Sequence, residues 1–255
     1  MRISLTQHLI SLKASGQKAL AILIDPDHIT RKDARDLIRQ AEAHKVDVLM
    51  VGGSLTIDQS IHDLIPWLKT HTHIPIVLFP GSILHIVPEA DAILLLSLIS
   101  GRNPDLLIGK HVEAAPLLQA SGLELMPTGY MLIDAGSPTT VNYMSNTFPI
   151  PHNKPQIAAC TALAGEQLGL KHIYMDGGSG AQRTISPQMI RAVADRIRIP
   201  LFVGGGIKTG KDAKTIWESG ADLIVVGTVL ESPSATHLLE ELSTEKFLLN
   251  HQIAR

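Results

Sequence analysis

The sequence predicts an α/β fold, a (β/α)8 TIM barrel formed by residues 1–255 as a single domain. Eight short apolar runs rich in Val, Ile and Leu show no alternation of polar and apolar residues, which is typical of parallel strands buried on both faces. A length of 255 residues with 45% hydrophobic content suits one barrel of this kind. The runs cover residues 19–25, 46–53, 75–81, 90–97, 123–132, 171–176, 200–205 and 221–227.

Helical patterns occupy most of the intervals between these runs. Apolar residues repeat at helical spacing over 34–41 and over 190–197. Thr30 with Asp33 resembles a capping box at the start of the first of these patterns. A capping side chain also precedes a proline, as at many helix starts, at residues 103–104, 186–187 and 232–233.

Two intervals depart from this alternation of apolar runs and helical patterns. Only residues 82–90 separate the third and fourth runs, which is near the minimum for a crossover helix, so the barrel wall is expected to be thin there. Residues 134–154 are rich in Ser, Thr, Asn and Pro and do not fit one regular helix. They are predicted to form a mobile loop at the active face.

Glycine-rich segments follow the last three apolar runs, at residues 174–180, 201–213 and 223–231. One glycine after a strand is more often simple turn chemistry, but three such segments in succession favour a binding site. Backbone N–H groups there can face a phosphate at helix N-termini, and barrels of this class commonly hold phosphate at the seventh and eighth strand ends. The predicted ligand is a small phosphate ester.

Two carboxylates, Asp25 and Asp27, directly follow the first run in the sequence LIDPDH. An isolated triplet of this kind is equally well explained as a solvated turn. At the rim of a phosphate-binding barrel, however, a carboxylate is a good candidate for Mg²⁺, which takes one or two carboxylates together with substrate phosphates. Ser54 adds a hydroxyl at the next strand end. A metal at the first two strand ends and a phosphate at the last three imply two anionic groups in one reaction.

Composition and charge exclude several classes of protein. A formal charge of −2, with scattered basic residues, argues against a nucleic-acid partner. No apolar run approaches the ~20 residues needed to span a bilayer, and the first residues do not read as a signal peptide. The single cysteine, Cys160, cannot form an internal disulfide and is predicted to be a small buried helix residue. We therefore expect a reducing, cytoplasmic location.

The motifs at these strand ends resemble, as an ordered set, the geranylgeranylglyceryl phosphate synthase family, which includes the heptaprenylglyceryl phosphate synthases. They are LIDPD, VGGS, LFPGS, GYMLID, YMDGGSGA, VGGGIKTGKDA and VVGT, running nearly from end to end. The resemblance implies a barrel whose third helix is missing or replaced by a short irregular segment, matching the short interval after Pro80. It implies a Mg²⁺-dependent prenyltransferase that joins a prenyl diphosphate, by default geranylgeranyl diphosphate, to the primary hydroxyl of sn-glycerol 1-phosphate and releases diphosphate.

The same resemblance implies roles for individual residues. Mg²⁺ would bind at Asp25 and Ser54, on the diphosphate side. The prenyl chain would lie along the thin wall around residues 82–90, where apolar side chains can line a groove. The expected contacts with sn-glycerol 1-phosphate are Tyr174, Met175, Asp176, Gly177, Gly178, Ser179, Gly180, Gly205, Gly206, Gly227 and Thr228.

Asp176 is the expected general base, because the glycerol hydroxyl must lose its proton when it attacks. The family usually presents glutamate at this position, so the shorter aspartate must lie closer to the hydroxyl or act through a water. An alternative is that Asp176 only orients the glycerol hydroxyls by hydrogen bonding. For Tyr130 in GYMLID, a hydrogen bond to the substrate and simple packing are both left open.

Two other classes of function share some of these features. A phosphosugar isomerase or epimerase would use the same glycine sites but needs a pair of acid/base residues flanking a sugar carbon, and no obvious pair is present. A non-catalytic phosphometabolite-binding protein has no use for Asp25 and Ser54 near a second anion. We also expect a homo-oligomer, either a dimer or a ring of dimers, and transient contact with a membrane surface for product release.

Overall fold

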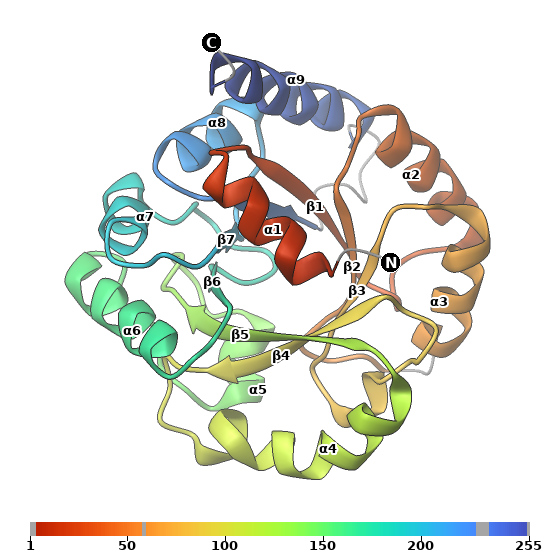
Figure 1. Cartoon of the computed structure of the whole chain (residues 1–255), viewed down its shortest axis with the longest axis horizontal. Helices are drawn as coiled ribbons and strands as arrows, with labels where there is room; N and C mark the ends of the chain where they lie inside the picture. The colour runs from red at the N-terminus through yellow and green to blue at the C-terminus, as the bar shows by residue number, and fades with distance from the viewer. Residues whose placement is uncertain (1–3, 58–59, 228–234, 254–255) are drawn as a thin grey trace.

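Eight parallel strands close into a barrel in chain order, which confirms the predicted fold class (Figure 1). This computed structural model describes residues 4–57, 60–227 and 235–253. The strands are β1 (Ala19–Ile24), β2 (Val48–Gly52), β3 (Ile76–Phe79), β4 (Ala92–Leu98), β5 (Glu124–Leu132), β6 (His172–Asp176), β7 (Leu201–Gly204) and β8 (Leu223–Val226). Each strand falls on one of the predicted apolar runs. Parallel pairing of β1 with β8, from Ala19 with Leu223 to Ile22 with Val226, closes the barrel.

Most of the helices lie around the barrel wall, and the first one crosses an end of the barrel (Figure 1). They are α1 (Leu5–Ala14), α2 (Arg31–Ala43), α3 (Ser60–His71), α4 (Lys110–Ser121), α5 (Thr140–Ser145), α6 (Pro155–Gln167), α7 (Pro187–Ala194), α8 (Gly210–Glu218) and α9 (Ala235–Ile253). The predicted helix starts at Thr30 and Ser186 are confirmed, since each hydroxyl accepts a backbone N–H of the first turn at 3.2 Å. The pair at 232–233 lies outside the described residues.

The barrel wall is thin between β3 and β4, as predicted. The connection contains the single 3₁₀ turn η1 (Ile83–His85) in place of a crossover helix. After β4 the chain forms a π-helical turn, η2 (Asp105–Gly109), which runs directly into α4. Leu95 and Leu96 in β4 are consequently only half-buried, whereas β2 and β3 are buried throughout. This leaves apolar strand surface accessible beside β4.

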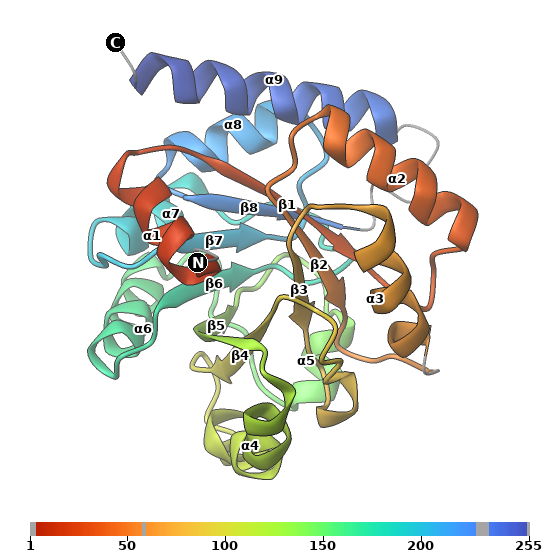
Figure 2. The ribbon, with the colours of Figure 1, turned by 45° about the vertical axis from the view of Figure 1, so that its right-hand side comes forward.

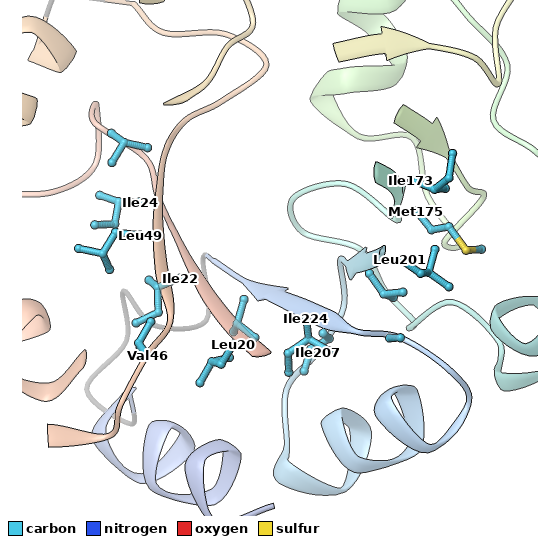
Figure 3. Close-up of a cluster of buried hydrophobic side chains, with 14 of the residues drawn as sticks. Leu20, Ile22, Ile24, Val46, Leu49, Ile173, Met175, Leu201, Ile207 and Ile224 are labelled. Atoms are coloured by element: carbon cyan, nitrogen blue, oxygen red, sulfur yellow. The ribbon is translucent and has the colours of Figure 1, made fainter. Parts of the chain in front are cut away.

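Strand side chains divide into two apolar layers, because successive residues of a strand point to opposite faces. The outer layer lies between the strands and the helices, and Figure 3 shows part of it, including Leu20, Ile22 and Ile224. The inner layer fills the barrel with aromatic rings whose neighbouring centroids are 5.5 to 6.2 Å apart. These rings belong to Phe79, Tyr130, Tyr174 and Phe202. The barrel is thus a packed core, and a ligand site has to lie at one of its ends.

Helix α1 covers the end of the barrel at which the strands begin, and α5 lies toward the opposite end (Figure 2). Leu5 of α1 belongs to the inner apolar layer. Glu124, the first residue of β5, accepts the N–H groups of Leu5 and Thr6 at 2.8 Å each. Lys13 pairs with Asp222, directly before β8, at 2.8 Å. Since this end is closed, the loops at the carboxyl ends of the strands are the place for a site.

Cys160 is exposed on α6, so the prediction that it is buried is wrong. The inward face of this helix is taken instead by Ala158, Ala159 and Ala162, which belong to the outer apolar layer. Within the described ranges, no helix is both long enough and apolar enough to cross a membrane.

His172, the first residue of β6, is a fully buried histidine inside the barrel, and the centroid of its ring lies 5.1 Å from that of Phe202. Neither ring nitrogen has a hydrogen bond of normal geometry within the described residues. Burial lowers the pKa of His172 from 6.5 to about 4, while the Pro127 carbonyl and the Glu124 charge oppose this shift. The folded protein therefore holds the ring neutral.

We expect acid to destabilise the protein through His172. The ring stays neutral in the folded state down to about pH 4, whereas unfolding lets it take up a proton below its ordinary pKa of 6.5. Its contribution is therefore fully present above pH 6.5 and is lost as the pH falls toward 4, by about 2 kcal/mol between pH 7.5 and pH 5. Denaturant unfolding of His172→Met should show a correspondingly smaller loss between these two pH values. An equal loss in both proteins would contradict the assignment.

Candidate functional site

The carboxyl ends of β6, β7 and β8 surround a cavity of about 370 Å³, which we call the glycine-rich cavity. Its lining consists of Leu23, Tyr174, Asp176, Gly178, Ser179, Gly180, Ala181, Gly205, Gly206, Ile207, Lys208, Val225, Val226 and Gly227. Most residues predicted to contact glycerol phosphate are therefore brought together. The sequence prediction did not include Leu23, Lys208 or the β8 valines among them.

The loops after β6 and β7 approach each other closely at this cavity. Gly205 and Gly206 have φ angles of +90° and +73°, which side-chain-bearing residues rarely adopt. A Cβ atom on Gly205 would lie only 2.7 Å from the backbone nitrogen of Gly177. Both glycines are thus required by the path of the backbone, and no side chain at these positions separates the backbone from a ligand.

The N-terminus of α8 is largely satisfied within the protein. Asp212 accepts the N–H groups of Lys208 and Thr209 at 3.1 and 3.0 Å, and Thr209 accepts the N–H of Asp212 at 3.1 Å. Gly210 N–H donates to Glu241 at 2.7 Å. The loop glycines before α8 are therefore better candidates for phosphate donors than the helix terminus that the sequence suggested.

Two predicted contacts stand apart from the glycine-rich cavity, and the position of a third is not described. The side chain of Met175 packs in the outer apolar layer, on the opposite face of β6 from Tyr174. Gly177 donates its N–H to the carbonyl of Gly204 at 3.0 Å and is not part of the lining. Thr228 lies outside the described residues.

Asp176 ends β6 and is buried at the edge of the glycine-rich cavity, with 8% of its surface exposed. The Tyr130 hydroxyl donates to Oδ2 at 2.6 Å, and Gly178 N–H donates to Oδ1 at 2.7 Å. Burial raises the pKa of Asp176, and these two hydrogen bonds partly offset that rise because they stabilise the charged form. The result is a carboxylate with a raised proton affinity beside a cavity suited to a phosphate ester.

A second cavity, of about 210 Å³, lies against the thin wall and is bounded by η1, β4 and α4; we call it the apolar cavity. Residues 134–154, predicted to be a loop, contain the short helix α5, and this helix contributes to the lining of the cavity. The full lining is Gly53, Ser54, Phe79, Pro80, Gly81, Ser82, Ile83, Ile86, Ile93, Leu94, Leu95, Leu96, Leu98, Leu106, Lys110, His111, Ala114, Leu118, Tyr130, Val141, Met144 and Ser145. It lies where the prenyl chain was expected.

The two cavities meet at Tyr130. This residue lines the apolar cavity, while its hydroxyl is bonded to Asp176 in the lining of the glycine-rich cavity. Tyr130 is 5% exposed, and burial together with the Asp176 charge raises its pKa well above the ordinary value. The hydroxyl therefore remains protonated and acts as a donor to the carboxylate. The sequence left open whether Tyr130 binds substrate or only packs. Its place near the end of the fifth strand was the one sequence feature that indicated a role in the site.

Asp25 and Asp27, which follow β1, have different surroundings. Asp27 Oδ2 accepts the N–H of Ile57 at 2.6 Å and so ties down the loop after β2. Asp25 is about one-third exposed, accepts the N–H of Asp27 at 3.0 Å, and lies 3.3 Å from the ring of His28. Its Oδ2 would be 3.8 Å from a Cβ on Gly53, the residue before Ser54.

Asp25 and Ser54 follow the neighbouring strands β1 and β2. The Asp25 carboxylate and the Ser54 hydroxyl are both oxygen donors, the kind of ligand that Mg²⁺ prefers, and substrate phosphates can supply further ligands. Among the residues that the structure describes, no group of three or more His, Cys, Asp or Glu forms a metal cluster.

Replacing Tyr130 with Phe should lower activity by raising the proton affinity of Asp176. The hydroxyl stabilises the charged carboxylate, so its loss moves the acid limb of the rate profile to higher pH. We expect kcat/KM on that acid limb to fall on the order of ten-fold or more, because a hydrogen bond to a charged group is worth about 1.5 to 3 kcal/mol. The pH dependence of kcat/KM in the two proteins is the measurement. An unshifted acid limb would count against coupling of Tyr130 to a titrating Asp176.

Comparison with known proteins places these features in one family. Residues 15–245 match the PcrB family. The chain is 51% identical over 232 residues to a geranylgeranylglyceryl phosphate synthase of Spirosoma linguale, covering 91% of this chain and 92% of that protein. It is 39% identical over 232 residues to the geranylgeranylglyceryl phosphate synthase of Pyrococcus horikoshii, covering 91% of each.

A solved structure gives the same picture. The (S)-3-O-geranylgeranylglyceryl phosphate synthase of Thermoplasma acidophilum, in complex with its substrate sn-glycerol-1-phosphate, superposes with a TM-score of 0.90 at 32% identity. The match covers 96% of this chain and 98% of the other.

Proposed function

Because this chain belongs to the PcrB family, we propose that it is a prenyltransferase that joins geranylgeranyl diphosphate to the primary hydroxyl of sn-glycerol 1-phosphate. One observation carries the proposal: a glycine-rich cavity and an apolar cavity meet at the hydrogen bond between Tyr130 and Asp176. A reaction that joins a phosphate ester to an isoprenoid requires these two environments side by side.

The acceptor occupies the glycine-rich cavity in this proposal. Backbone N–H groups around Gly205 and Gly206, together with the Lys208 side chain, hold the phosphate. The primary hydroxyl points to Asp176, whose carboxylate accepts its proton. Tyr130 and Gly178 fix the orientation of that carboxylate through their hydrogen bonds.

The donor occupies the apolar cavity, with its diphosphate among the loops after β1, β2 and β3. Asp25 and Ser54 are the residues that would hold Mg²⁺. When bound, Mg²⁺ neutralises the departing diphosphate. The apolar lining from η1, β4 and α4 accommodates the isoprenoid and keeps water away from the reacting carbon.

The chemical step forms one bond and breaks another. The bond between the allylic carbon and the diphosphate oxygen breaks, the glycerol oxygen forms an ether bond to that carbon, and the hydroxyl proton moves to Asp176. Diphosphate leaves with the bonding electrons. The raised pKa of Asp176 matches this role, because the ionised form of a carboxylate with higher proton affinity takes the proton more readily.

A transfer assay tests the proposed function. The purified protein is incubated with radiolabelled sn-glycerol 1-phosphate and a panel of prenyl diphosphates, with and without Mg²⁺, and extracted into organic solvent. Label should enter the organic phase with geranylgeranyl diphosphate and only when Mg²⁺ is present. Turnover of a phosphosugar without a donor would support an isomerase instead, and ligand binding without any product would support a binding protein.

The proposal extends to assembly and location. It includes a homo-oligomer, either a dimer or a ring of dimers, and the exposed apolar side chains of Val112 and Leu117 on α4 support this. Light scattering of the purified protein measures the oligomeric state. A cytoplasmic location is included because the single cysteine gives no internal disulfide.

A further inference from the structure

His85 is a buried histidine in the short turn that replaces the crossover helix after β3. Only 4% of its surface is exposed, and both ring nitrogens contact loops at the strand ends. Gly81 N–H donates to Nδ1 at 3.1 Å, and Nε2 lies 2.5 Å from the Thr56 hydroxyl. Because Nδ1 accepts from an N–H group, the neutral ring carries its proton on Nε2 and donates it to Thr56. His85 thus bridges the loop after β3 and the loop after β2.

The bridge reaches the part of the site that would receive diphosphate. Thr56 lies two residues after Ser54, and Gly81 packs against the same loop, since a Cβ on Gly81 would lie 2.9 Å from the Ser54 carbonyl oxygen. Gly53, Ser54 and Gly81 all line the apolar cavity. In most barrels of this class a crossover helix supports the loop after the third strand. Here η1 is too short to do so, and the ring of His85 takes over that support.

We infer that His85 is a positioning residue for the diphosphate half of the site, acting through Thr56 on the loop after β2. It touches neither reacting atom, and none of the sequence motifs pointed to it. The inference rests on the proposed function, because it assigns the Ser54 side of the apolar cavity to the diphosphate. A residue that orients a metal-binding loop typically contributes ten- to hundred-fold to affinity or activity.

The test measures binding separately from turnover. Titration calorimetry with inorganic diphosphate in the presence of Mg²⁺, and with sn-glycerol 1-phosphate alone, is performed on the wild type, His85→Ala and Thr56→Val. We expect both variants to bind Mg²⁺-diphosphate about ten- to hundred-fold more weakly and to bind glycerol phosphate as the wild type does. The KM for geranylgeranyl diphosphate should rise in parallel.

Two further variants make the test specific. The double variant should be no weaker than His85→Ala, because both changes break the same bridge and their effects are not additive. His62→Ala is the matched control, since His62 also contacts η1, through the Leu84 carbonyl at 2.9 Å, and has no hydrogen bond to the part of the loop after β2 that the structure describes. It should bind diphosphate normally.

Several outcomes would overturn the inference. Normal diphosphate binding by Thr56→Val would overturn it. Because this change is isosteric, the result can be interpreted even if His85→Ala fails to fold. Equal weakening of both ligands would show a general structural role instead. Absence of transfer by the wild type would reject the proposed function itself, whereas active wild type with unaffected variants would reject only the role of His85.

Discussion

Replacing Asp176 with Asn should reduce kcat by about 10²- to 10⁴-fold while leaving the affinity for sn-glycerol 1-phosphate nearly unchanged. This is the range that a positioned general base contributes. The amide keeps the size of the side chain, but it cannot take a proton from the glycerol hydroxyl at neutral pH. Steady-state kinetics gives kcat, and calorimetry gives the glycerol phosphate affinity independently.

Two comparisons sharpen this experiment. Asp176→Glu keeps a carboxylate and should retain far more activity than Asp176→Asn. Asp134→Asn removes a half-exposed carboxylate at the same end of the barrel, paired with Arg183 at 3.4 Å and outside both cavities, and should leave kcat near that of the wild type. If Asp176→Asn weakened glycerol phosphate binding and spared kcat, Asp176 would only orient the substrate hydroxyls.

Replacing Asp25 with Ala should abolish Mg²⁺-dependent transfer, with a loss of about 10³-fold or more, while glycerol phosphate binding persists. Removing a carboxylate ligand takes away several kcal/mol of charge stabilisation at the departing diphosphate. Asp25 is not part of the lining of the glycine-rich cavity, so its loss should leave the acceptor largely unaffected. Transfer rates measured over a range of Mg²⁺ concentrations give the result.

The control for this prediction is Asp36→Ala. Asp36 is a half-exposed carboxylate on α2, paired with the nearby Arg39 at 3.1 Å, and should tolerate the change. Transfer by Asp25→Ala with the Mg²⁺ dependence of the wild type would remove Asp25 as a metal ligand. Asp27 would then be the next residue to examine, although its bond to Ile57 already uses one carboxylate oxygen.

The fold could be predicted from the sequence because parallel barrel strands are continuous apolar runs. Each strand from β1 to β8 coincides with such a run, and the short interval over 82–90 predicted the thin wall. The glycines of the phosphate side were also visible, because a positive φ at Gly205 and Gly206 demands that residue type. These features depend on residues close together in the chain.

Contacts between distant loops could not be predicted in the same way. The Tyr130 hydroxyl meets Asp176 across 46 positions, and His85 meets Thr56 across 29. Neither pair has a spacing that a helix or strand repeat would generate, so only the closed barrel brings them together. Likewise, the residue pattern alone shows two similar carboxylates at Asp25 and Asp27. The family resemblance favoured Asp25 as the metal ligand, and the structure adds that Asp27 is bonded to the loop after β2.

Closure of the barrel has a consequence for synthesis of the chain. β1 pairs on one edge with β8, which is synthesised about 200 residues later. Helix α1 likewise cannot make its contacts with Glu124 and Asp222 until those residues have been synthesised. At ~5 to 20 residues per second, the edge of β1 stays unpaired for roughly 10 to 40 seconds on the ribosome. An unpaired apolar edge is a template for other chains. In a nascent chain stalled before β8, the free edge of β1 therefore remains open to pairing with strands of other chains.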